Sequence, residues 1–203
     1  GGLVGLVDSP NPGKNSLTMI ECSNNGNVYV TQKKTTAVGG LIGHRYYLDN
    51  SARSTSITLT DCVNNGDVTF DNSAATNRIY IGGFCGHMQE TLLACVIKNC
   101  TNKGDVSCRS MCYCAGGFIG LAMGVEINSC TNEGNVTVVE EESSSNWNLV
   151  GGLIGFQELR TGKTNHSIVT GCINSGDVSA TFKSTRSSFP FPSAGGIVGD
   201  IKA

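Results

Sequence analysis

Two short phrases alternate along the whole chain. The first is Gly-Gly-φ-φ-Gly, where φ is an apolar residue, and it occupies residues 1–5, 39–43, 82–86, 116–120, 151–155 and 195–199. The second is Cys-x-Asn-x-Gly-(Asn/Asp)-Val, and it occupies residues 22–28, 62–68, 100–106, 130–136 and 172–178. Strict alternation of fixed phrases indicates a repeat array, in which each repeat is one structural unit stacked on the next.

The spacing of the phrases is uneven. Successive cysteines of the second phrase lie 40, 38, 30 and 42 residues apart. Fixed phrases separated by unequal intervals indicate a constant frame that carries loops of variable length.

Each repeat contains three strand-like pieces. The first is the Gly-Gly phrase, the second alternates apolar and polar residues before the cysteine (Ile57 and Leu59), and the third alternates after the Gly turn (Val68 and Phe70). Such alternation is typical of a strand with one buried face. Three short strands in a 30-residue minimum period predict one coil of a parallel β-solenoid, with equivalent residues stacked about 4.8 Å apart.

The predicted fold is therefore an all-β, parallel β-helix of about five to six coils with three short strands per coil. Crossovers between parallel strands are nearly always right-handed, so we expect a right-handed helix. A β-propeller is the alternative, but the interval between Cys100 and Cys130 leaves little room for a fourth strand in each blade.

The asparagine of the second phrase predicts a ladder at a corner of the coil. A stacked Asn amide can donate to the carbonyl of the next Asn, and Asn tolerates left-handed backbone angles beside Gly. The predicted ladder consists of Asn24, Asn64, Asn102, Asn132 and Asn174.

The cysteine of the same phrase predicts a second ladder. Strict alternation from Leu59 would turn Cys62 outward, so we infer a bend just before the cysteine that brings the thiol inside, where Cys behaves as a small hydrophobe. This ladder consists of Cys22, Cys62, Cys100, Cys130 and Cys172. Three further cysteines align with apolar residues of other coils and should also be buried: Cys85, Cys95 and Cys108.

Together the two phrases resemble the GLUG-motif repeats of large surface proteins, which include bacterial adhesins and the non-catalytic parts of some immunoglobulin A peptidases. The resemblance extends from Gly1 to Gly199. It implies a surface-exposed, solenoid-like stalk or adhesive segment, and the motif carries no catalytic residues to transfer.

Composition limits the partners and the organisation. Only 15% of the residues are charged and the net charge is −2, so no basic stripe is present to hold nucleic acid. The longest uncharged stretch, 110–125, is shorter than the roughly 18 residues of a spanning helix and contains four glycines. We expect one β-solenoid domain over residues 1–203, as a fragment of a longer array whose neighbouring coils would pack on its ends.

Two small clusters are candidates for chemistry. Asp67 and Asp105 lie in an outward column and could act as a catalytic carboxylate pair or as calcium ligands, although Asp beside Gly is an ordinary turn residue. His44 and His87 follow equivalent glycines in adjacent coils and could form half of a metal site, but no third ligand recurs. We therefore expect no metal, no cofactor and no catalysis.

The remaining cysteines form the run Cys108, Cys112 and Cys114. Zinc sites usually use Cys-x2-Cys spacing with a second pair elsewhere, which this run lacks. Because Cys108 has a core position, Cys112 and Cys114 are left on one side of a strand as exposed thiols or a strained local bridge. We favour packing or a minor disulfide over a metal site.

Location and function are inferred from sequons and loops. Asn99, Asn135 and Asn165 begin N-glycosylation sequons, which indicate an extracellular or cell-surface protein. The variable loops carry an acidic run at 140–142 and six candidate ligand-binding residues: Arg45, Tyr46, Tyr47, Trp147, Phe189 and Phe191. Exposed aromatic rings at these positions suit stacking on a glycan or contact with a protein partner. The alternative is that they pack on their own coils.

The sequence thus predicts a non-catalytic structural or adhesive segment of a surface glycoprotein. Two alternatives are a carbohydrate-active β-helix enzyme and a subunit of an extracellular filament.

Overall fold

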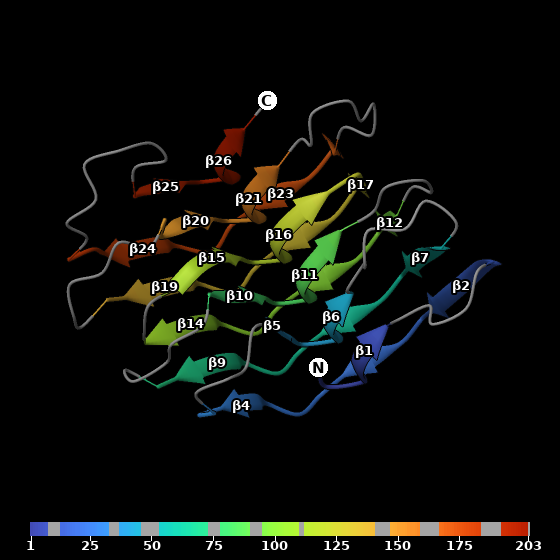
Figure 1. Cartoon of the computed structure of the whole chain (residues 1–203), viewed down its shortest axis with the longest axis horizontal. Helices are drawn as coiled ribbons and strands as arrows, with labels where there is room; N and C mark the ends of the chain where they lie inside the picture. Colours follow the sequence, from blue (N-terminus) through green and yellow to red (C-terminus); the bar gives the residue numbers. More distant parts are fainter. Residues whose placement is uncertain are drawn as a thin grey trace.

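The structure is a computed structural model, and it describes residues 1–7, 13–32, 37–45, 53–72, 78–89, 95–109, 112–140, 147–158, 167–183 and 192–202. These residues form 26 β-strands and no helix (Figure 1). Within these ranges, accordingly, nothing forms a helix of the length and apolarity that crossing a bilayer requires.

The strands belong to five parallel sheets. Sheet A contains β1 (Val4–Val7), β6 (Ile42–Arg45), β11 (Cys85–Gln89), β16 (Ile119–Met123), β21 (Ile154–Glu158) and β26 (Val198–Lys202). Sheet B contains β2 (Gly13–Ile20), β7 (Arg53–Thr60), β12 (Cys95–Lys98), β17 (Val125–Asn128) and β22 (Ile168–Thr170). Sheet C contains β3 (Ser23–Asn24), β8 (Val63–Asn64), β13 (Thr101–Asn102), β18 (Thr131–Asn132) and β23 (Ile173–Asn174).

The other two sheets complete each coil. Sheet D contains β4 (Val28–Val30), β9 (Val68–Asp71), β14 (Val106–Arg109), β19 (Val136–Val139) and β24 (Val178–Thr181). Sheet E contains β5 (Ala37–Gly39), β10 (Ile79–Gly82), β15 (Cys112–Gly116), β20 (Leu149–Gly151) and β25 (Ser193–Gly195). The chain passes through A, B, C, D and E and then returns to A one coil further along.

Equivalent residues of successive coils stack in register. Val68 pairs with Val28 and with Val106, and Phe84 stacks on Phe118 with ring centroids 4.6 Å apart. This is the parallel β-solenoid that the sequence predicts. The hand of the helix stays a prediction.

The number of strands per coil was predicted wrongly, because each coil has five strands and not three. The Gly-Gly phrase is a corner, so the residues around it divide between the end of a sheet E strand and the start of a sheet A strand. The bend before the cysteine and the turn at Gly likewise isolate the two-residue strands of sheet C.

The two phrases meet across the middle of each coil. The second glycine of the Gly-Gly corner lies against the asparagine of the same coil: a Cβ on Gly83 would be 2.5 Å from Cγ of Asn102, and one on Gly40 would be equally close to Asn64. The phrases therefore alternate because they form the two sides of a narrow waist that has no room for a side chain on that glycine.

The waist separates two cores. One lies between sheets A and B and includes Phe84, Phe118 and the cysteine ladder, and the other lies between sheets D and E and includes Phe70 and Ile81. In Figure 1 sheets B and D lie on opposite sides of the molecule. A third apolar cluster fills the angle between the outer faces of sheets A and E.

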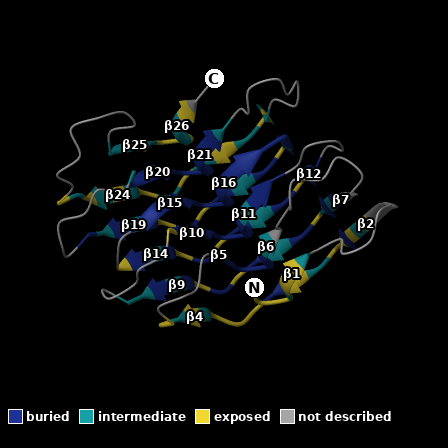
Figure 2. Ribbon diagram, in the orientation of Figure 1, coloured by how far each residue is buried: buried dark blue, intermediate teal, exposed yellow. Residues whose placement is uncertain are grey.

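Burial is greatest in the central coils and smallest at the two ends (Figure 2). Phe84 and Phe118 are 0% exposed, whereas Leu3 and Ile197 in the same column of the first and last coils are 45% and 39% exposed. Each central coil is covered on both sides, and each fully buried Phe contributes about 1.5–3 kcal/mol relative to an exposed one.

Candidate functional site

The asparagine ladder is continuous and buried at its centre. In the first four members of the ladder, Nδ2 of the Asn donates to Oδ1 of the Asn in the next coil at 2.7 to 2.8 Å. The same Nδ2 also donates to the carbonyl oxygen two residues ahead, as from Asn102 to Gly104 at 2.8 Å. Both amide hydrogens of Asn102 are thus used, and its side chain is 0% exposed, so the predicted ladder is confirmed.

The cysteine ladder is also confirmed, together with the bend that precedes it. The residue before each cysteine has a positive φ, for example +53° at Asp61 and at Asn99. Cys62, Cys100 and Cys130 are buried, while the terminal Cys22 and Cys172 are half-buried.

The cysteine thiols have a polar role that the sequence did not reveal. The backbone N–H of Cys62 donates to Sγ of Cys100 at 3.4 Å, and the thiol of Cys62 donates to the carbonyl oxygen of Thr60 at 3.3 Å. The same contacts recur in the next coils. Each thiol therefore satisfies backbone groups at the bend, and burial raises the pKa of Cys62.

The outward column that holds Asp67 and Asp105 is a third ladder. Oδ1 of Asp67 accepts the backbone N–H of Asp105 at 2.9 Å, and Oδ1 of Asp105 accepts that of Asn135 at 2.7 Å. Asn27 and Asn135 make the same bond in their own coils. Both carboxylates are exposed, as expected, and both bind backbone.

His44 and His87 are neighbours, as predicted. Their rings stack with centroids 4.9 Å apart, and Nε2 of His44 lies 3.1 Å from Nδ1 of His87. Burial lowers the pKa of His44. Among the described residues, no three His, Cys, Asp or Glu side chains are grouped so that they could hold a metal ion.

Cys112 and Cys114 pack in the protein, as one of the alternatives had it, but the expectation of exposed thiols on one side of a strand was wrong, because both thiols are fully buried. In sheet E, Ile79 pairs with Cys112 and Tyr80 with Cys114, so Tyr113 is an extra, bulged residue. The bulge turns Cys112 into the core between sheets D and E and Cys114 into the cluster outside sheets A and E. All ten cysteines carry free thiols.

Residues 77–107 match the family model of the GLUG motif. This chain carries the GLUG motif. The matched residues run from just before β10 to the middle of β14, so they take in strands from all five sheets and nearly one coil of the solenoid. The GLUG repeat of this chain is therefore one turn that includes one Gly-Gly corner and one Asn corner.

Among curated proteins and among solved structures, none matches this GLUG-containing chain.

A row of aromatic rings fills the angle between sheets A and E. Tyr113 stacks on Trp147 with ring centroids 4.5 Å apart, and Trp147 meets Phe156 edge-on at 5.1 Å. Tyr80 contacts Tyr113 at 5.4 Å, and burial raises the pKa of Tyr80 to about 12. Trp147, predicted as a binding residue, is thus half-buried and packs on its own coils.

The row continues to the histidine pair. The ring of Tyr80 lies 4.7 Å from that of His87, and the guanidinium of Arg78 lies 4.8 Å from the ring centroid of Tyr113. This row could not be predicted from the sequence, because Tyr80, Trp147 and Phe156 come from different columns. They meet only through the Tyr113 bulge and the angle between sheets A and E.

A buried carboxylate was also missed. Glu140, which begins the acidic run assigned to a variable loop, is 1% exposed. Its Oε2 accepts hydrogen bonds from Nδ2 of Asn148 at 3.1 Å and from the backbone N–H of Lys183 at 2.7 Å. It ties two coils together at the outer end of sheet D.

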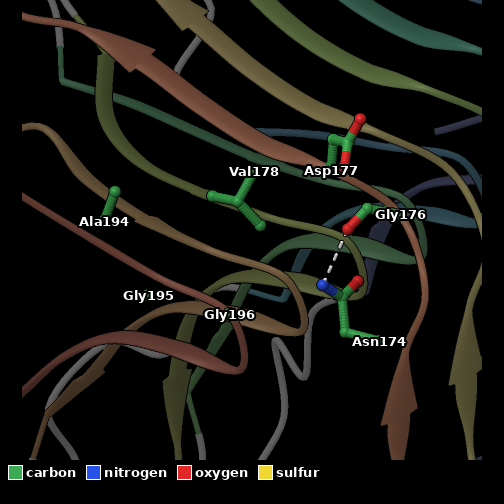
Figure 3. Close-up of a pocket in the computed structure, with 7 residues that line it drawn as sticks. All are labelled: Asn174, Gly176, Asp177, Val178, Ala194, Gly195 and Gly196. Carbon is green, nitrogen blue, oxygen red and sulfur yellow. Dashed lines mark hydrogen bonds between the residues drawn. The ribbon is translucent and has the colours of Figure 1, made fainter.

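A polar pocket opens at the last coil (Figure 3). Its volume is about 300 Å³, and it is lined by the Asn and Gly-Gly corners of the final coil: Asn174, Gly176, Asp177, Val178, Ala194, Gly195 and Gly196. Asn174 still donates to Gly176 at 2.9 Å. The pocket is the waist of the coil without a following coil over it.

Several predicted site residues lie outside the described residues, namely Tyr46, Tyr47, Phe189, Phe191 and Asn165. Arg45 ends β6, and its side chain is not described. Of the sequon asparagines, Asn99 and Asn135 are exposed. Glycosylation at these positions stays a prediction.

Proposed function

We propose that this chain is a non-catalytic segment of an extracellular or cell-surface β-helical protein. It acts as a rigid spacer and binds a glycan or protein partner through its variable loops. The proposal is supported by what the repeated residues do. The Asn ladder, the Cys ladder and the outward column of Asp67 and Asp105 are all hydrogen-bonded to the next coil. The parts that differ from coil to coil are therefore the loops, where binding residues are usually found.

The observation that carries the non-catalytic part is the bonding of the two carboxylates. Asp67 and Asp105 accept backbone N–H groups of the next coil, and Asn135 does the same in their column. A position that accepts Asp and Asn equally serves a hydrogen bond and needs no proton transfer.

The enzyme alternative is tested with Asp67→Asn and Asp105→Asn, which keep the backbone hydrogen bond. The parent chain is incubated with a panel of acidic and neutral polysaccharides, and reducing ends and unsaturated products are measured. We expect no product from the parent chain or either variant. Cleavage by the parent chain would refute the non-catalytic proposal, and its loss in Asp105→Asn alone would identify a catalytic carboxylate.

The adhesive part is tested by binding of the purified chain to a glycan array and to host-cell surface preparations. Two loop variants, Tyr46→Ser with Tyr47→Ser and Phe189→Ser with Phe191→Ser, are compared with Tyr29→Ser. Tyr29 is 63% exposed on sheet D and provides the matched control. We expect at least a tenfold loss of binding in one loop variant and none in the control. Equal binding by all variants would contradict the role of the loops.

Location is tested by the intact mass of surface-derived protein before and after deglycosylation. We expect a mass loss that maps to the exposed Asn99 or Asn135. An unchanged mass in surface-derived material would remove the glycan part of the proposal.

The filament alternative predicts end-to-end stacking through the unpaired strands of the terminal coils. Particle length, measured by small-angle scattering, would then grow with protein concentration.

A further inference from the structure

The connection between β14 and β15 is unusually short. Only residues 110–111 separate these strands, whereas residues 72–78 separate β9 from β10 and residues 140–148 separate β19 from β20. Sheet D therefore turns almost directly into sheet E in this coil, and the two strands lie against each other.

Cysteines flank this turn on its inner side. Cys108 is the last inward residue of β14 and pairs with Phe70 and Val138, and Cys112 is the first residue of β15 and pairs with Ile79. Both side chains are at most 1% exposed and belong to the same core. The strands that carry the two cysteines are in contact at this turn.

We propose that Cys108 and Cys112 form a disulfide that closes this turn when the chain folds under oxidising conditions. A thiolate of one cysteine attacks a small disulfide such as oxidised glutathione, and the other cysteine then displaces the glutathione from the mixed disulfide. The two cysteines lose two protons and two electrons and gain one S–S bond, and the oxidant is reduced to two thiols.

The other cysteines are poorly placed to compete. Cys114 lies on the opposite face of β15 because of the Tyr113 bulge. Ladder cysteines are one coil apart, and the strand spacing of about 4.8 Å holds their Cβ atoms further apart than the roughly 3.8 Å of a disulfide. Their thiols also hold the backbone at the bend, as between Cys62 and Cys100.

The bond should form during folding and only slowly afterwards. In the folded chain the thiol of Cys112 is buried, and its contact with Cys108 together with burial raises its pKa. Thiolate is therefore scarce in the folded state, and attack on an oxidant is slow.

The test uses the full chain produced twice, in an oxidising secretory compartment and in a reducing cytosol. Both preparations are alkylated with N-ethylmaleimide under denaturing, non-reducing conditions. Cleavage with trypsin and a glutamate-specific protease then separates residues 104–109 from residues 110–126, because Arg109 lies between the two cysteines. We expect eight of the ten thiols to react in oxidised material and the two peptides to remain joined.

Two serine variants identify which cysteine pairs with Cys108, and circular dichroism shows whether each variant still folds. Cys114→Ser should keep the joined peptides, and Cys112→Ser should lose them and leave nine reactive thiols while the circular dichroism stays β-rich. The oxidised parent chain should melt a few degrees above the reduced one. Ten reactive thiols in oxidised material, or a link from Cys108 to Cys114 or to a ladder cysteine, would overturn the proposal. Because the location is imposed by the expression host, failure here would leave the proposed surface function untouched.

Discussion

At the scale of the residue, repeated side chains act mainly by hydrogen-bonding to the next coil. Asn102 illustrates what a sequence can predict: Asn beside Gly at a fixed interval indicates a stacked amide, and the structure contains it. Cys62 illustrates the limit. Its inward position followed from the predicted bend. Its bonds to backbone groups could not be predicted, because they depend on a positive φ at Asp61, and a positive φ is hard to predict for a residue other than Gly.

Replacement of Asn102 with Ala should destabilise the protein strongly. The change leaves buried amide groups of Asn64 and Asn132 without partners, and we expect a loss of roughly 2–4 kcal/mol in the free energy of unfolding. Chemical denaturation measures it. Asn25→Ala is the control, since Asn25 accepts a bond from Asn65 at the exposed surface and should change stability by less than about 0.5 kcal/mol. Equal effects would contradict a special role for the buried ladder.

Stability should fall as the medium becomes mildly acidic. Burial lowers the pKa of His44 below 6.5 in the folded chain, so the unfolded chain binds the proton first as the pH falls through 6.5 towards the folded pKa. Melting temperatures should decrease as the pH is lowered from 8 to 5, which is roughly the range in which histidine titrates. His44→Leu should flatten the curve, because Leu6 and Leu121 occupy the same column. An unchanged slope in that variant would assign the effect to other groups.

At the scale of the element, periodicity predicted the strands and steric detail decided the corners. The alternation of Val68 and Phe70 is enough to place β9 with one face in the core. The positions of Cys112 and Cys114 could not be predicted, since a bulge at Tyr113 reverses which face the following residues occupy and depends on pairing with Ile79 and Tyr80. The same bulge gathers the aromatic row.

Gly83→Ala tests the narrow waist. The new methyl group would collide with the Gly117 carbonyl oxygen and the Asn102 side chain, so we expect a loss of roughly 3 kcal/mol or more in unfolding free energy. Gly196 occupies the same place in the last coil and has no atom within 4 Å of its virtual Cβ. Gly196→Ala should therefore change stability by less than about 0.5 kcal/mol. A similar loss at both positions would show that backbone freedom, and not space, selects the glycine.

At the scale of the whole molecule, the solenoid is a stack in which a coil contacts mainly its neighbours. Central coils are covered on both sides and the terminal coils on one, which explains why Leu3 and Ile197 are exposed while Phe84 is not. The number of coils followed directly from the count of phrases. The loops did not, because their lengths and compositions share no pattern from which a structure could be predicted.

Removal of one complete coil should leave a folded protein. Deletion of residues 101–130 joins Cys100 to Thr131 and restores the phrase, so every ladder can re-form with one member fewer. We expect a β-rich circular dichroism spectrum, a lower melting temperature and a molecule shorter by about 4.8 Å in small-angle scattering. Deletion of residues 101–115 removes only part of a coil and should abolish folding. Survival of both deletions would contradict the stacked register.

The asparagine ladder also makes the molecule directional. Every amide donates forward along the chain, from Asn24 towards Asn174, so the side-chain dipoles all point the same way and reinforce one another. The first coil consequently offers an oxygen acceptor at this position, and the last coil offers an N–H donor within its pocket. An added coil continues the ladder only in the same orientation, because an inverted coil brings donor against donor. The two ends of the stack are therefore chemically different, because the hydrogen bonds of the five stacked Asn side chains all run in one direction.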